Sequence, residues 1–171
     1  MPNTLYLLIG PKGAGKSHIG ALISRHTSIH FLLVEPLWLS LQPGEDGWQK
    51  VEAAIDTLLT AHPTVMIESL GVGDGFRAFH ARLAQKYRLR LIRVRADPET
   101  CLARVQSRSR ADHIPVSMEQ VQAYNRLAAE VAYAWDLEID NNHPQPEADL
   151  INAFLALQAA DDHAHAAGGP A

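Results

Sequence analysis

A chain of 171 residues is long enough for one α/β domain and short for two. Its apolar content of 47% is sufficient for a real core, and its formal net charge of -4 argues against binding nucleic acid through overall charge. The single cysteine, Cys101, excludes an internal disulfide framework. No run of about 18 apolar residues and no secretory signal pattern is visible, so we expect a cytoplasmic protein that does not enter the membrane.

Short apolar runs alternate with helical patterns along the chain. Strands are predicted at residues 5–9, 31–34, 64–67, 89–94 and 137–140, and helices near residues 16–26, 46–61, 75–87, 98–108, 117–134 and 147–160. Strands separated by helices of this length predict right-handed crossovers and a parallel sheet. We therefore expect one domain over residues 1–160, followed by a disordered tail over residues 161–171.

Residues 10–17 read GPKGAGKS and match the phosphate-binding pattern G-x-x-x-x-G-K-[ST] between the first predicted strand and helix. The glycines let the backbone turn its N–H groups inward, and the helix N-terminus adds to this nest for phosphate oxygens. Lys16 is predicted to neutralise the β- and γ-phosphates of a nucleoside triphosphate, and Ser17 to place its hydroxyl on Mg²⁺. The predicted nucleotide contacts come from Gly10, Pro11, Lys12, Gly13, Ala14, Gly15, Lys16, Ser17 and His18.

Two acidic residues follow predicted strands, and ligands of open parallel sheets bind at the carboxyl ends of the strands. Glu68 ends the third strand, where it is predicted to hold a Mg²⁺-bound water or to orient the attacking group. Glu35 ends the second strand and could contact Mg²⁺, act as base toward an acceptor hydroxyl or bind the substrate. A capping or surface role remains the alternative for each.

Three arginines follow the fourth predicted strand, at positions 104, 108 and 110. Arg104 and Arg108 are four residues apart and share one helix face. Their planar guanidinium groups suit adenine stacking and phosphate binding. A lid near residues 108–117 would bring Arg108 and Arg110 over the nucleotide and exclude water. A solvated basic helix end is the alternative.

The chain resembles the shikimate kinase, gluconate kinase and adenylate kinase group over about residues 4–155. The resemblance is carried by the phosphate loop, by the third strand that ends in an acid, and by the L-x-R-x-x-x-R-x-R run of residues 102–110. The resemblance implies a three-layer P-loop NTPase fold, with a five-stranded parallel sheet in order 2-3-1-4-5 flanked by helices. It also implies ATP with Mg²⁺ as donor and a small molecule as acceptor. Arg104 would lie against the adenine, Arg108 or Arg110 would reach the phosphates, and Asn141 would border the adenine pocket.

The acceptor is not assigned, because the chain departs from the patterns of that group. Shikimate kinases tend to carry D-x-D at the end of the second strand, where this chain has only Glu35, and their G-G-G run after the third strand is absent here. Candidate acceptor contacts are Glu35, Gly71, Arg77 and Arg126, the last matched by position to an arginine that binds the acceptor carboxylate. Trp38 and Trp48 lie in the segment after the second strand, where acceptor-binding subdomains usually occur; core packing is their expected role, and acceptor binding is the alternative.

The interpretation that follows is a kinase that moves the γ-phosphate of ATP to a small-molecule hydroxyl, with Lys16, Arg108 and Arg110 stabilising charge. One alternative is a nucleotide-dependent switch or ATPase that acts with a protein partner. Another is a nucleotide or RNA-end kinase, which would require a basic groove. The oligomeric state stays open.

Overall fold

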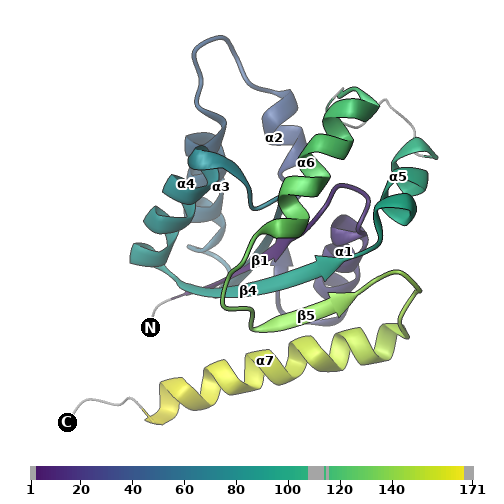
Figure 1. Cartoon of the computed structure of the whole chain (residues 1–171). Coiled ribbons are helices and arrows are strands. Elements are labelled where there is room, and N and C mark those ends of the chain that lie inside the picture. The colour runs from purple at the N-terminus through teal and green to yellow at the C-terminus, as the bar shows by residue number, and fades with distance from the viewer. Residues whose placement is uncertain (1–2, 108–113, 115, 168–171) are drawn as a thin grey trace.

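The computed structural model describes residues 3–107, 114 and 116–167 (Figure 1). Its strands are β1 (Thr4–Ile9), β2 (His30–Phe31), β3 (Thr64–Ser69), β4 (Arg88–Arg95) and β5 (Leu137–Asp140). They form one five-stranded sheet in the order β2-β3-β1-β4-β5. Every neighbouring pair is parallel, which confirms the predicted sheet and strand order.

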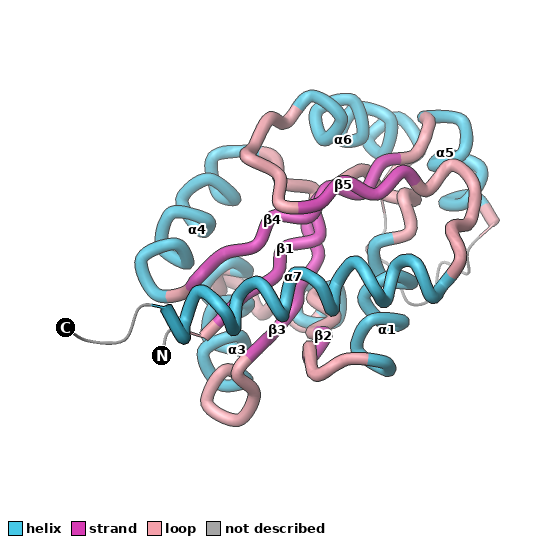
Figure 2. The backbone as a smooth tube through the Cα atoms, turned by 90° about the horizontal axis from the view of Figure 1, so that it is seen from below, coloured by secondary structure: helices cyan, strands magenta, loops and turns pink. Residues whose placement is uncertain are grey.

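Helices cover both faces of this sheet and give three layers. They are α1 (Lys16–His26), α2 (Glu35–Leu39), α3 (Gly47–Leu58), α4 (Gly73–Lys86), α5 (Pro98–Gln106), α6 (Met118–Glu130) and α7 (Glu147–Ala167). Figure 2 shows α7 and α1 lying across one face of the sheet, and Figure 1 shows α3 and α4 together on the other. None of the helices in the described part of the chain combines the length and the apolarity needed to cross a bilayer.

The central strand β1 explains why the phosphate loop starts from a rigid base. Its side chains alternate, so that Leu5, Leu7 and Ile9 enter the core beneath α3 and α4. Tyr6 and Leu8 enter the core beneath α1 and α7. All five side chains are fully buried, and each large apolar side chain contributes about 1.5–3 kcal/mol on burial.

The second strand is shorter than predicted, and this changes the position of Glu35. β2 ends at Phe31, and Glu35 is the first residue of the short helix α2. Pro36 stands at the start of that helix, where its fixed φ and missing N–H are favourable. The prediction that Glu35 ends a strand is therefore wrong, although it remains near the same edge of the sheet.

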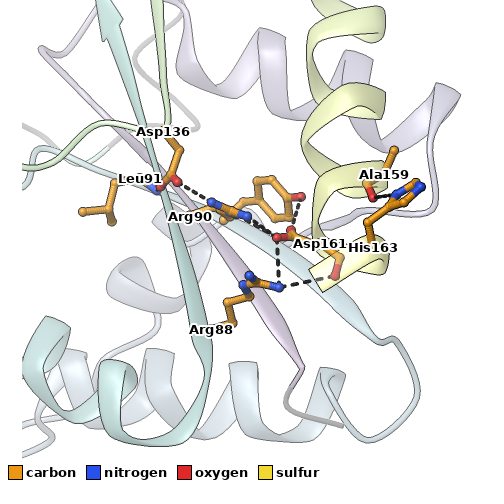
Figure 3. A network of polar contacts seen from close by, with 8 residues as sticks. Arg88, Arg90, Leu91, Asp136, Ala159, Asp161 and His163 are labelled. Carbon is orange, nitrogen blue, oxygen red and sulfur yellow. Dashed lines mark hydrogen bonds and ion pairs between the residues drawn. The ribbon is translucent and has the colours of Figure 1, made fainter. Parts of the chain in front are cut away.

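The C-terminal helix continues past its predicted end at residue 160 to Ala167, so the disordered tail predicted from residue 161 is wrong over residues 161–167. The reason is Asp161, which is buried and belongs to the polar network in Figure 3. The Oδ1 atom of Asp161 accepts a hydrogen bond from Arg90 Nε at 2.9 Å and lies 3.3 Å from Arg88 Nη1. The Oδ2 atom accepts a hydrogen bond from the Tyr6 hydroxyl at 3.1 Å. A polar anchor of this kind leaves no apolar periodicity in the sequence.

Candidate functional site

The phosphate loop joins β1 to α1 as its sequence predicts. Gly13 and Gly15 have φ values of 91° and 98°, which side chains other than glycine rarely adopt. A Cβ atom on Gly13 would lie 2.2 Å from the carbonyl oxygen of Cys101. The loop therefore requires glycine here for both conformation and space, and α1 begins directly after it with the free N–H groups of a helix N-terminus.

Lys16 is a buried cation within this loop. Its Nζ donates to the carbonyl oxygens of Gly10 and Pro11, at 2.7 and 2.8 Å. These bonds keep the ammonium group close to the loop backbone, where a phosphate group would bind in a nest of this type. The contact of Lys16 with the β- and γ-phosphates stays a prediction.

Ser17, in the first turn of α1, meets Glu68 near the carboxyl end of β3. The Ser17 hydroxyl lies 2.9 Å from Oε1 and 2.8 Å from Oε2 of Glu68. Mg²⁺ prefers oxygen ligands and keeps several waters beside one or two carboxylates and substrate phosphates, so this donor pair fits the ion. Over the described ranges, no group of three or more His, Cys, Asp or Glu could hold a metal by itself. Phosphate and water oxygens would have to complete the coordination of Mg²⁺ at this pair.

Glu35 links the first turn of α2 to two other parts of the site. Its Oε1 accepts from Lys12 Nζ at 3.4 Å and from the backbone N–H of Ile114 at 2.9 Å. The carboxylate thus contacts the phosphate loop on one side and the chain leading into α6 on the other. One cavity is lined by Ser17, Glu35 and Glu68, three residues that lie far apart in the sequence.

Asn125 is a site residue that the sequence analysis did not identify. Its Oδ1 accepts from the backbone N–H of Lys12 at 2.7 Å, and its Nδ2 donates to the backbone carbonyl of Lys12 at 2.9 Å. Asn125 therefore pairs with both backbone groups of Lys12, as a residue on a neighbouring β-strand would, and so fixes this part of the phosphate loop. A signal was present in the sequence, since the buried face of α6 consists of Val121, Asn125 and Ala128, and an amide within an apolar stripe requires partners.

Arg104 and Asn141 contact the other side of the loop. Arg104 donates to the backbone carbonyl of Asn141 at 2.8 Å and to that of Gly13 at 3.5 Å. The Asn141 side chain donates to the carbonyl of Ala14 at 2.8 Å. Both residues thus lie next to the loop, where the resemblance places the adenine, and contact with a base stays a prediction.

A cavity of about 270 Å³ opens beside the phosphate loop. Its polar wall comes from the loop, Ser17, Glu35, Glu68 and Ser69. Its apolar wall comes from the α2 and α3 side and from the loop after β3, with Val34, Trp38, Trp48, Val51, Leu70 and Val72. Trp38 and Trp48 also pack against the core below α3 and α4, as predicted, so they serve the core and the cavity together.

Three predicted acceptor contacts do not line this cavity. Arg77 is exposed on α4 and pairs with Asp74. Arg126 lines a separate cavity between α5 and α6. Gly71 is buried, and its carbonyl accepts from the Tyr133 hydroxyl at 3.1 Å. The structure brings Glu35 to the cavity but not these three residues.

The remaining predictions concern the exposed His18 at the start of α1 and the lid. Arg108, Arg110 and most of the expected lid near residues 108–117 lie outside the described residues. Their predicted contacts with the phosphates stay predictions.

Comparison with known proteins identifies the fold. No protein-family model matches the sequence, and no curated protein is significantly similar to it. Among solved structures, a gluconokinase from Sinorhizobium meliloti is 16% identical with a TM-score of 0.63, over 98% of each chain. A sugar kinase from a Janibacter species is 16% identical with a TM-score of 0.64, over 91% of this chain and 94% of that one. A shikimate kinase from Acinetobacter baumannii, in complex with shikimate, is 20% identical with a TM-score of 0.57, over 94% of this chain and 95% of that one. The chain therefore has the fold of the small P-loop kinases.

Proposed function

We propose that this protein is an ATP-dependent phosphotransferase that moves the γ-phosphoryl group of ATP to a hydroxyl of a small molecule. The observation that carries this proposal is the contact between Ser17 and Glu68, beside Lys16, at the edge of a cavity that also contains Glu35. A phosphate nest without an adjoining cavity would support nucleotide binding only. Here the cavity provides space for an acceptor next to the phosphate loop.

Each of these side chains has a task in phosphoryl transfer. Lys16 binds the β- and γ-phosphates, and Ser17 and Glu68 hold Mg²⁺, directly or through water. Bound Mg²⁺ neutralises charge on the phosphate oxygens. Glu35 orients the acceptor hydroxyl and receives its proton, as the oxygen bonds to the γ-phosphorus and the bond to the bridging oxygen of ADP breaks. Glu35 is assigned this task because Glu68 is assigned to Mg²⁺ together with Ser17 under this proposal.

The experiment that tests this proposal combines calorimetry with phosphorus NMR. Wild-type protein should bind a non-hydrolysable ATP analogue with Mg²⁺ and, given ATP and a metabolite extract, should produce a new phosphomonoester. Lys16→Ala should abolish both while retaining the wild-type circular dichroism spectrum. Lys50→Ala is the matched control, because Lys50 is a lysine on α3 that pairs with Glu45 away from the loop.

The outcome separates the proposed function from its alternatives. Unchanged analogue affinity in Lys16→Ala would show that the loop does not bind the triphosphate, and the proposal would fail. Release of free phosphate alone, stimulated by an added protein fraction, would indicate a nucleotide-dependent switch or ATPase instead. Labelled oligonucleotide as the product would indicate an RNA-end kinase.

A further inference from the structure

The cavity beside the phosphate loop has an aromatic wall. Trp38 from α2 and Trp48 from α3 both line it, and their ring centroids lie 5.0 Å apart with an interplanar angle of 86°. The two indoles thus pack edge to face against each other, and together they form an aromatic corner of the cavity wall. Aromatic ligands bind such surfaces in offset-stacked or edge-to-face arrangements.

This corner is held rigidly by the packing behind it. A Cβ atom on Gly47 would lie 2.0 Å from the Trp38 ring, so glycine at this position lets Trp38 lie directly against the start of α3. Trp48 packs against Phe79 at a centroid distance of 4.8 Å and against Phe76 at 5.7 Å. Because the indoles are fixed before a ligand arrives, little conformational entropy is lost on binding.

The charges of the cavity argue against an anionic acceptor. Its charged lining residues are Lys12, Lys16, Glu35 and Glu68, two of each sign. Lys12 already pairs with Glu35, and Lys16 is assigned to the triphosphate under the proposed function. Among the described lining residues there is no arginine or histidine, and arginine is the residue that usually binds a carboxylate or phosphate in bidentate fashion.

The polar groups that face an acceptor suit a hydroxyl. Glu35 can accept a hydrogen bond from an alcohol, and its charge is balanced by Lys12 beside it. Ser69 also lines the cavity, and its oxygen accepts from the backbone N–H of Gly71 at 3.1 Å, so its own hydroxyl hydrogen can point to an acceptor oxygen. From the aromatic corner and this charge pattern we infer that the acceptor is an uncharged alcohol that carries a planar ring, rather than a hydroxy acid or a phosphate ester.

This inference rests on the proposed function and is tested by binding rather than by turnover. Calorimetry first establishes that the Mg²⁺-bound, non-hydrolysable ATP analogue binds. With the analogue saturating, tryptophan fluorescence is titrated with thymidine and guanosine, with their 5′-monophosphates, and with shikimate and gluconate. Thymidine or guanosine should change the fluorescence with a Kd at least about tenfold below those of the four anionic probes.

Variants show whether the aromatic corner is responsible. Trp38→Leu should raise the Kd of the uncharged probe about tenfold without changing the affinity for the ATP analogue. Trp38→Phe should restore much of that affinity, which keeps the test valid if the leucine variant folds poorly. Trp135→Phe is the matched control, because Trp135 packs against Tyr133 and Arg93 and does not line the cavity.

The inference is overturned if a monophosphate, shikimate or gluconate binds more tightly than both nucleosides. It is also overturned if neither nucleoside binds while the ATP analogue does, or if Trp38→Leu leaves the Kd unchanged. These results would leave the proposed kinase function intact. Failure of the wild-type protein to bind the ATP analogue would instead refute the proposed function and this inference with it.

Discussion

Asn125 provides the sharpest test of how the phosphate loop is held. Its amide makes two hydrogen bonds to the backbone of Lys12, which is 113 residues away in sequence. Asn125→Ala removes both bonds at a position only 9% exposed, where water cannot fully replace them. The variant should therefore lose stability, and the loop that we propose to bind the triphosphate should become less ordered.

The magnitude follows from the number of bonds. Each net hydrogen bond contributes about 0.5–1.5 kcal/mol, so two bonds give a loss of about 1–3 kcal/mol in the free energy of unfolding. For a domain of this size each kcal/mol lowers Tm by about 2–4 °C. If about 1.4 kcal/mol of the loss appears in ligand binding, because the loop must then be ordered on binding, the affinity for an ATP analogue falls about tenfold.

The assays are thermal and urea denaturation together with calorimetric titration of the ATP analogue. Asn125→Asp is an informative partner variant, since a carboxylate still accepts from the Lys12 N–H but cannot donate to the Lys12 carbonyl. It should be destabilised as well. Gln122→Ala is the control, because Gln122 is an exposed residue on the same helix, and its stability should remain within about 0.5 kcal/mol of wild type. Asn125→Ala with wild-type stability and wild-type affinity would refute the role assigned to Asn125.

Three further predictions concern the metal pair and the C-terminal anchor. Glu68→Gln keeps an oxygen beside Ser17 but removes the negative charge. The Mg²⁺ concentration required for half-maximal turnover should therefore rise by about 10–100-fold. An unchanged Mg²⁺ titration would contradict the assignment of Glu68 to Mg²⁺. Asp161→Asn should lower the free energy of unfolding by about 3 kcal/mol in urea denaturation. This is the low end for a broken buried ion pair, because Arg90 keeps Asp136 as a second carboxylate partner. A loss below about 1 kcal/mol would argue against a structural role for the Arg90–Asp161 pair. Burial, with the charge and hydrogen bond of Asp161, raises the pKa of Tyr6 above its ordinary value of 10.0. The folded state therefore keeps this proton longer than the unfolded state, and the stabilisation is complete below pH 10 and is lost as the pH rises toward the raised pKa. Tyr6→Phe should show a shallower alkaline decline of Tm than wild type, and parallel curves would be the contrary result.

The sequence by itself determined the elements whose signals are local. The phosphate loop was predictable because Gly13, Gly15 and Lys16 form a contiguous motif between a buried strand and a helix, and each glycine is required by backbone geometry. The strand order was predictable from the resemblance, and alternation of strands and helices indicated the parallel sheet. The start of α6 depends on local residues in the same way, because the side chains of Ser117 and Gln120 form a capping box with each other's backbone N–H groups.

Only the tertiary structure decided which side chains meet across the fold. Spacing could not show that Asn125 binds Lys12, that Arg126 faces a different cavity from Glu35, or that Asp161 anchors the last helix. These contacts join residues far apart in sequence, and their geometry depends on how whole helices pack on the sheet. Local periodicity reports which face of an element is buried, whereas the partner of a buried polar group is set by the neighbouring element.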